Sequence, residues 1–251
     1  MLTIAPDAQI VDIGHNVRKF AIRDGAFLLW CAVPYLPRGV HVAVVDPGVG
    51  TERRPIAIRA GRGDLLVGPD NGLLMPAAAR LGGVEAAHVL ENRDYWLPVT
   101  TSTFHGRDIF SPVGAHLALG ARLESVGPSI DPATLVDLRF PAPAVHERVL
   151  ETAVLYIDSF GNARLAGEPV DLEAALGPLV PGRRVVLEIE DGRGGTFREA
   201  TTWQRTFGRV AAGDSLLYED SFGLVSLADN QGNVAERLAL VPDRRVRILA
   251  A

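Results

Sequence analysis

Cysteine and lysine are almost absent from this chain of 251 residues, which contains one of each, Cys31 and Lys19. One cysteine cannot form an internal disulfide, and the apolar run 27–36 around Cys31 predicts a buried, unreactive thiol. Nearly all the basic residues are arginines, scattered along a chain whose net charge is −5. Because proteins that bind nucleic acids gather basic side chains to neutralise phosphates, no nucleic-acid partner is expected.

Several functional motifs are also lacking. The chain has no Walker A loop and no G-x-G-x-x-G segment, so neither a P-loop nucleotide hydrolase nor a conventional dinucleotide fold is supported. No two histidines have metal-ligand spacing and no Cys/His cluster occurs, so no metal site is expected. The chain has no signal peptide and no apolar stretch long enough to span a bilayer, which predicts a soluble cytoplasmic protein without a membrane partner.

The first 140 residues alternate between strand-like and helix-like segments. Residues 8–13 and 55–60 predict short strands, and residues 40–45, which are mostly valine, are typical of a strand buried on both faces. Residues 108–119 predict a helix. This alternation predicts an α/β domain over residues 1–140, with a mostly parallel sheet flanked by helices.

The pattern changes after residues 137–145, a stretch with two prolines that is typical of a linker. The apolar segments that follow are short, alternate with polar residues and are separated by Gly, Asp or Pro; 149–157 and 184–190 are examples. Such a series predicts a small β-barrel domain over residues 146–251.

Three polar clusters in the first domain could carry chemistry. Asp46 ends the valine-rich strand and is followed by a turn with two glycines and by Arg53; loops at the carboxyl ends of strands line ligand crevices in open α/β sheets. Asn71 follows a further strand expected over residues 64–67. His105 stands between Phe104 and Gly106 before a helix, where an imidazole can act as an acid or base. From local sequence alone, turn formation and helix capping are the preferred interpretations of the first two clusters.

The second domain contains two Asp-Ser-Phe-Gly segments, which begin at Asp158 and at Asp220. Either can be a plain hairpin turn. Either can also recognise a ligand, with an aromatic ring to stack on a base and with hydroxyl and amide groups to bind polar atoms. Composition does not choose between these interpretations.

Five segments in order along the chain carry a family resemblance. They are VVDPGVGTERR (44–54), GPDNGLL (68–74), TFHGRDIFSPVGAHLA (103–118), IDSFGNARL (157–165) and DSFGLVSLADNQGNVAERL (220–238). Together they resemble the S-adenosylmethionine hydroxide adenosyltransferases, which hydrolyse S-adenosyl-L-methionine to adenosine and L-methionine. That family is related to fluorinating and chlorinating enzymes that act on the same substrate, and its fold is an α/β domain followed by a β-barrel.

The resemblance implies a catalytic triad of Asp46, Arg53 and His105. In the family these groups activate a water that attacks the ribose 5′ carbon and displaces methionine, which leaves as a neutral thioether and needs no acid. Arg53 would hold the carboxylate and the water through charge-assisted hydrogen bonds. Either Asp46 or His105 could take the proton of the water.

The resemblance also assigns substrate contacts. Phe20 is expected near the ribose, and Asp158 and Ser221 are expected to hold the amino and carboxyl groups of the methionine part. Asn162 and Phe207 are expected to contact and stack on adenine. Asn71, Phe104, Gly106 and Phe222 complete the expected substrate-binding set. The resemblance implies no cofactor, and it implies a homotrimer with sites at subunit interfaces.

Two alternatives to hydrolysis remain. The first alternative is an enzyme that uses halide, like the halogenating relatives. Where those relatives have tyrosine followed by serine, this chain has His105 and Gly106, which favours water over halide as the nucleophile. Family members begin with a strand that carries a ribose-binding aspartate, whereas Met1–Asp7 aligns with the end of the helix that follows it. We therefore expect this strand to be missing from the sequence, either because its start is misassigned or because the protein is truncated. An S-adenosylmethionine or adenosine binder without catalytic activity is therefore the other alternative.

Overall fold

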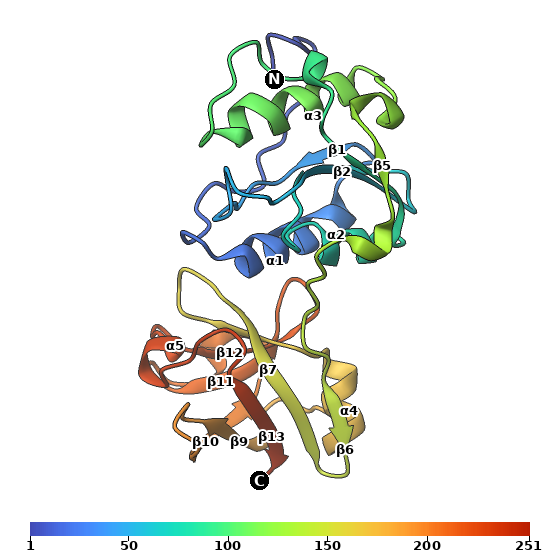
Figure 1. Ribbon diagram of the computed structural model, residues 1–251. Helices are drawn as coiled ribbons and strands as arrows, with labels where there is room; N and C mark the ends of the chain where they lie inside the picture. The colour runs from blue at the N-terminus through green and yellow to red at the C-terminus, as the bar shows by residue number, and fades with distance from the viewer. The chain divides into compact units, whose positions relative to one another are not determined.

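The chain folds into two compact units, Met1–Arg139 and Phe140–Ala251, in a computed structural model that describes residues 1–251 (Figure 1). Each unit has its own buried apolar core. No helix of the chain is both long enough and apolar enough to cross a membrane.

A five-stranded sheet with the order β1-β3-β2-β4-β5 forms the centre of the first unit. Its strands are β1 (Val40–Val42), β2 (Pro55–Ala60), β3 (Leu65–Pro69), β4 (Val84–Val89) and β5 (Ser129–Ile130). The mixed α/β class is confirmed, but the expectation of a mostly parallel sheet is corrected. Only β1 and β3 are parallel, whereas β2 runs antiparallel to β3 and β4, and β5 runs antiparallel to β4.

The connection between β2 and β3 explains this difference. Residues 61–64 are all that separate the two strands. So short a connection can only reverse the chain, because a parallel pair needs a crossover of about a dozen residues or more. The result is a hairpin in the middle of the sheet, with β1 added in parallel along its outer strand.

Helices cover both faces of this sheet. Figure 1 shows α3 (Ser111–Ala118) on one face and α1 (Ile22–Ala32) with α2 (Met75–Arg80) on the other. Two glycines allow close packing: a Cβ on Gly25 of α1 would lie 2.8 Å from Val45, and one on Gly114 of α3 would lie 2.5 Å from Val42. Both helices thus approach the segment that leads to Asp46.

The second unit is a closed barrel of seven strands. They are β7 (Val149–Ile157), β8 (Ala163–Leu165), β9 (Arg184–Glu190), β10 (Thr196–Trp203), β11 (Ser215–Glu219), β12 (Val225–Asp229) and β13 (Arg245–Ala250). The ring closes because β13 pairs with β9 on one side and with β7 on the other. The predicted barrel is therefore confirmed. Outside the ring lie β6 (Ala144–His146), α4 (Pro169–Leu176) and α5 (Val234–Arg237).

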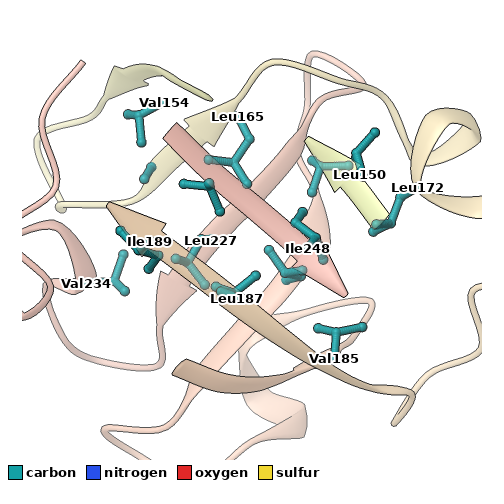
Figure 2. Packing of buried hydrophobic residues seen from close by; sticks show 14 of the residues in the cluster. Leu150, Val154, Leu165, Leu172, Val185, Leu187, Ile189, Leu227, Val234 and Ile248 are labelled. Atoms are coloured by element: carbon teal, nitrogen blue, oxygen red, sulfur yellow. The ribbon is translucent and has the colours of Figure 1, made fainter. Parts of the chain in front are cut away.

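Alternating residues of the barrel strands point inward and fill its core (Figure 2). On β9, Val185, Leu187 and Ile189 are fully buried, while Arg184 and Glu190 at the two ends are exposed. Each buried side chain of this kind stabilises the fold by about 1.5–3 kcal/mol. This core gives a rigid base to the turns that connect the strands.

Candidate active site

Asp46 lies just beyond the end of β1. The backbone N–H of Ala43 still bonds to the carbonyl of Val67 on β3, at 3.0 Å, so the chain continues beside the sheet after the strand. At Asp46 it turns, and Gly50 adopts a φ of +78°, where a Cβ would meet the carbonyl oxygen of Ser102 at 2.9 Å. The turn thus needs glycine at this position, both for its backbone conformation and for its close approach to another loop.

Arg53 forms a fork on the carboxylate of Asp46. Its Nε donates to Oδ1 at 3.1 Å, and its Nη2 donates to Oδ2. The two side chains are only 7% and 6% exposed. A buried pair of this geometry combines two charge-assisted hydrogen bonds, and removal of one partner would leave an uncompensated buried charge. The guanidinium also lies 5.4 Å from the ring centre of Phe110.

The same guanidinium contacts His105. Nη2 of Arg53 lies 3.2 Å from Nδ1 of the imidazole. Because a guanidinium can only donate, Nδ1 must be the acceptor, and the proton of the neutral ring is therefore on Nε2. Burial, and next the positive charge of Arg53, lower the pKa of His105 below the ordinary histidine value. The imidazole is therefore held neutral, with an N–H group at Nε2.

A buried carboxylate, Asp108, fixes the loop that carries His105. His105 leads into a π-helical turn, Gly106–Phe110, that continues into α3. Within this turn Asp108 accepts hydrogen bonds from N–H and Oγ1 of Thr101, both at 2.8 Å, and from Nε of Arg107 at 2.6 Å. The bonds from Arg107 and Thr101 hold the pKa of Asp108 well below its usual range. From the sequence, Asp108 was expected at most to cap the helix after His105 and was not among the predicted site residues, although the threonines just before His105 were a possible signal for this contact.

A cavity of about 630 Å³ opens beside these groups. Asp46, Phe104, His105 and Gly106 line it, and Asp46 is the one carboxylate among its lining residues. Most of the remaining wall is apolar or hydroxyl-bearing: Met1, Thr3, Ile4, Val44, Val49, Leu97, Thr103, Ser111 and Pro112. Arg107 adds a guanidinium to this wall. One acid and one imidazole at the wall of such a cavity could orient a small polar molecule between them.

Phe20 and Asn71 do not line this cavity. Phe20 is 75% exposed and has a φ of +67°, which is unusual for a residue other than glycine. The amide of Asn71 is used within the fold: Nδ2 donates to the carbonyl of Val45 at 2.9 Å, and Oδ1 accepts from the N–H of Leu73 at 3.2 Å. Asn71 thus ties the segment before Asp46 to the segment that leads into α2.

The barrel has a cavity of its own, of about 510 Å³. Three of the predicted contacts line it, namely Asp158, Asn162 and Phe207, while Ser221 and Phe222 do not. It is also lined by residues outside the set of substrate contacts that the resemblance assigned: Phe160, Asp229, Gln231 and Gly232. All four lie within two of the family segments, 157–165 and 220–238, so their place in these segments was the signal that could have identified them.

Ion pairing and ring packing hold the walls of the barrel cavity. Arg237 donates from Nε and Nη2 to the two oxygens of Asp229, at 2.8 and 2.7 Å. The ring of Phe207 lies 4.9 Å from that of Tyr218, centre to centre.

No group of three or more His, Cys, Asp or Glu side chains in the chain could hold a metal ion.

Comparison with known domain families adds to this geometry. Residues 1–127 match the SAM hydroxide adenosyltransferase N-terminal domain, and residues 152–247 match the C-terminal domain of the same name. The chain belongs to the SAM hydroxide adenosyltransferase family. The first match contains Asp46, Arg53 and His105, and the second contains the residues that line the barrel cavity.

Individual relatives agree with this assignment. An (R)-S-adenosyl-L-methionine hydrolase of Salinispora tropica is 47% identical over 249 residues, which are 98% of this chain and 88% of the relative. A fluorinase of Actinopolyspora mzabensis is more distant, at 28% identity over 99% of this chain and 89% of the relative. The crystal structure of an uncharacterized conserved protein from Thermotoga maritima superposes with a TM-score of 0.87 at 31% identity, covering 99% of this chain and 91% of that one.

Proposed function

We propose that this protein hydrolyses S-adenosyl-L-methionine to adenosine and L-methionine. One observation carries the proposal: Arg53 bonds to both Asp46 and His105 beside a cavity, in a chain of the SAM hydroxide adenosyltransferase family. The Salinispora relative, whose name specifies the R configuration, supports the choice of substrate and makes the R epimer the one to test first.

The proposed reaction begins with a water held between His105 and Asp46. Because Arg53 occupies Nδ1 of His105, the imidazole donates from Nε2 to the water oxygen and orients it. The oxygen attacks the 5′ carbon of the ribose, and the carbon–sulfur bond breaks with its electron pair going to sulfur. Methionine leaves as a neutral thioether, and the proton of the attacking water passes to Asp46 and then to solvent.

Arg53 acts on the two other groups in this scheme. It keeps both oxygens of Asp46 oriented and keeps His105 in the tautomer that donates to water. His105 is not the base in this scheme, because a proton on Nδ1 would point at a guanidinium that can only donate. The sequence left the choice of base open between the two, and this contact favours Asp46.

The other parts of the substrate are assigned to the predicted binding residues. We propose that Asn162 and Phe207 hold adenine in the barrel cavity, and that Asp158 and Ser221 hold the amino and carboxyl groups of the methionine part. Phe20, Phe104, Gly106 and Phe222 are proposed to surround the substrate, and Asn71 is proposed to act through the segment that it positions. We also propose a homotrimer with sites at subunit interfaces and a reaction without a cofactor; a cytoplasmic location stays a prediction.

The decisive test is product analysis in ¹⁸O-labelled water. The purified protein is incubated with each sulfonium epimer of S-adenosylmethionine. The products are separated by chromatography and their masses are determined by mass spectrometry. We expect adenosine with one ¹⁸O at its 5′ hydroxyl, together with unlabelled methionine. Asp46→Asn should abolish turnover, whereas Asp137→Asn, which alters an exposed aspartate paired with Arg139, should not.

Other outcomes separate the alternatives. Formation of 5′-chloro-5′-deoxyadenosine in excess chloride would assign the protein to the halide-using relatives, such as the fluorinase at 28% identity. Tight binding of S-adenosylmethionine without any product would favour a binding protein. Unlabelled adenosine would contradict the attack of water on the 5′ carbon.

A further inference from the structure

The two Asp-Ser-Phe-Gly turns of the barrel have the same hydrogen-bond scheme. Oδ1 of Asp158 accepts from the N–H groups of Phe160 and Asn162, at 2.9 and 3.0 Å. Oδ1 of Asp220 accepts from the N–H groups of Phe222 and Leu224, at 2.8 and 3.0 Å. One carboxylate oxygen of each aspartate therefore builds its turn, and the other oxygen, Oδ2, remains for a second partner.

Arg164 contacts the second oxygen of both aspartates. It lies on β8, which pairs with β7 on one side and with β12 on the other. Its Nε donates to Oδ2 of Asp220 at 2.8 Å, and its Nη1 lies 3.6 Å from Oδ2 of Asp158. The side chain is 14% exposed. One guanidinium thus connects two turns that lie far apart in the sequence.

Aromatic rings limit the movement of this guanidinium. The ring centres of Tyr156 and Phe222 lie 5.6 and 5.4 Å from the carbon at its centre. Cations at this distance from an aromatic ring are attracted to it, and here the attraction keeps Arg164 between the two turns. Because Phe222 is itself part of the second turn, the arginine holds that turn through both its aspartate and its aromatic ring.

The two aspartates are engaged to different degrees. Oδ2 of Asp220 takes the short bond from Arg164 and a further one from Oγ of Ser226, at 3.3 Å, and this side chain is 4% exposed. Asp158 is 17% exposed, and its Oδ2 has only the longer contact with Arg164 and a bond of 3.1 Å from Nδ2 of Asn162. Asp220 is therefore committed to the fold, whereas Asp158 keeps an accessible carboxylate edge.

We propose that Arg164 is a positioning residue that aligns the two Asp-Ser-Phe-Gly turns, so that Asp158 and Ser221 together receive the amino-acid part of the substrate. This inference rests on the proposed function. The contact with Arg164 orients the carboxylate of Asp158 toward an ammonium group, and the bond to Asp220 sets the backbone on which Ser221 lies. Nε and Nη1 of Arg164 make no bond to the adenine-side residues Asn162 and Phe207. Asn162 bonds to Asp158 through its N–H as well as its Nδ2, and the N–H bond goes to Oδ1, which Arg164 does not contact.

The test compares Arg164→Met with a matched control, Arg198→Met. Arg198 lies on the same barrel and bonds to Glu188, but its side chain is 72% exposed and has no proposed role. For Arg164→Met we expect KM for S-adenosylmethionine and the inhibition constant of methionine to rise about tenfold, as expected for the loss of one charge-assisted contact. The inhibition constant of adenosine and kcat should change by less than about twofold, because Arg164 acts on the amino-acid side of the site. A purely structural defect would instead weaken the binding of methionine and of adenosine alike.

A second variant keeps the test decisive if Arg164→Met does not fold. Arg164→Lys keeps the charge but cannot reach both carboxylates with a rigid fork, so it should fall between the wild type and Arg164→Met. If both Arg164 variants match Arg198→Met in KM and in methionine affinity, or if methionine and adenosine affinities fall together, the positioning role is wrong while hydrolysis stands. If the wild type binds S-adenosylmethionine without turnover, hydrolysis is refuted and the positioning role is not. The affinity of Arg164→Lys for S-adenosylmethionine, measured by calorimetry, then tests the positioning role, and an affinity equal to that of the wild type would refute it. A wild type that does neither overturns both proposals.

Discussion

Nη2 of Arg53 donates to Nδ1 of His105 across 3.2 Å while the same guanidinium holds both oxygens of Asp46. One side chain thereby sets the orientation of an acid and the tautomer of an imidazole that lie far apart in the chain. Neither property would survive the loss of the arginine, because a water molecule could not reproduce three donors in one rigid plane.

Replacement of Arg53 by lysine should remove most of the activity. A lysine ammonium keeps the charge but cannot make the fork on Asp46 and the bond to His105 together, so we expect kcat to fall by about 10²–10³, as for the loss of other oriented donors. The measurement is kcat with S-adenosylmethionine, beside a thermal unfolding curve.

The neighbouring arginine provides the control for this variant. Arg54 makes a similar fork on Asp70, at 2.8 Å from Nε, but neither residue lines the cavity. Arg54→Lys should therefore lower the melting temperature and leave kcat within about twofold of the wild type. Equal losses of kcat in both variants would show that Arg53 acts through stability alone.

Acidification should inactivate the protein through His105. Its pKa lies below the ordinary value of 6.5 because the ring is buried and faces Arg53. Activity should therefore be level through neutral pH and fall only at lower pH, where a proton on Nδ1 breaks the bond from Arg53 and charges the ring. The checks are kcat/KM against pH and an NMR titration of the imidazole.

The same pKa shift has a consequence for stability. Because the folded-state pKa of His105 is lowered, the unfolded chain takes up the proton first as the pH falls. The stability contributed by this group is full above the unfolded pKa of about 6.5 and is lost as the pH falls from there through the folded pKa. His105→Gln should remove this part of the pH dependence; an unchanged profile in that variant would assign the titration to another group.

Strands bounded by turn residues were predictable from the sequence. The expected ranges 55–60, 149–157 and 184–190 coincide with β2, β7 and β9, because each apolar or alternating run ends at Gly, Asp, Pro or charged residues. By contrast, residues 8–13 were expected to be a strand and form none. Their alternation lacks a partner strand, and strand propensity has little force without one.

The contacts of the candidate site were only partly predictable. Asp46 and Arg53 belong to one turn, so their proximity follows from the local sequence. Their contact with His105 depends on the packing of the π-helical turn against the sheet, and no local sequence pattern predicts this contact. The family resemblance, rather than composition or periodicity, predicted that these three residues belong together.

Gly106→Ala tests whether the cavity beside His105 receives the substrate. The backbone at Gly106 has no positive φ, and a new Cβ would lie 3.6 Å from Val44, at ordinary contact distance. The fold should therefore tolerate the change, and the melting temperature should stay equal or rise slightly, since alanine favours helical backbone by up to about 1 kcal/mol over glycine. Because Gly106 lines the cavity, the methyl group should nevertheless lower kcat/KM by about tenfold.

An exposed glycine serves as the control for this variant. Gly14 also lacks a positive φ, and a Cβ there would meet nothing within 4 Å. Gly14→Ala should leave kcat/KM unchanged. If Gly106→Ala folds and keeps full activity, the cavity beside His105 does not hold the reacting part of the substrate.

The two matching turns of the barrel should respond differently to the same substitution. Gly161 and Gly223 both have positive φ, +83° and +78°, so alanine at either position strains the backbone by about 1–2 kcal/mol. At Gly223 the new Cβ would meet nothing within 4 Å, but at Gly161 it would lie 1.9 Å from Oδ1 of Asn233. That oxygen caps α5 by accepting from the N–H of Glu236 at 2.9 Å, so relief of the clash would break the cap. In urea unfolding, the free energy of unfolding should therefore fall more for Gly161→Ala than for Gly223→Ala, by at least about 1 kcal/mol. Equal decreases would show that Asn233 moves aside freely.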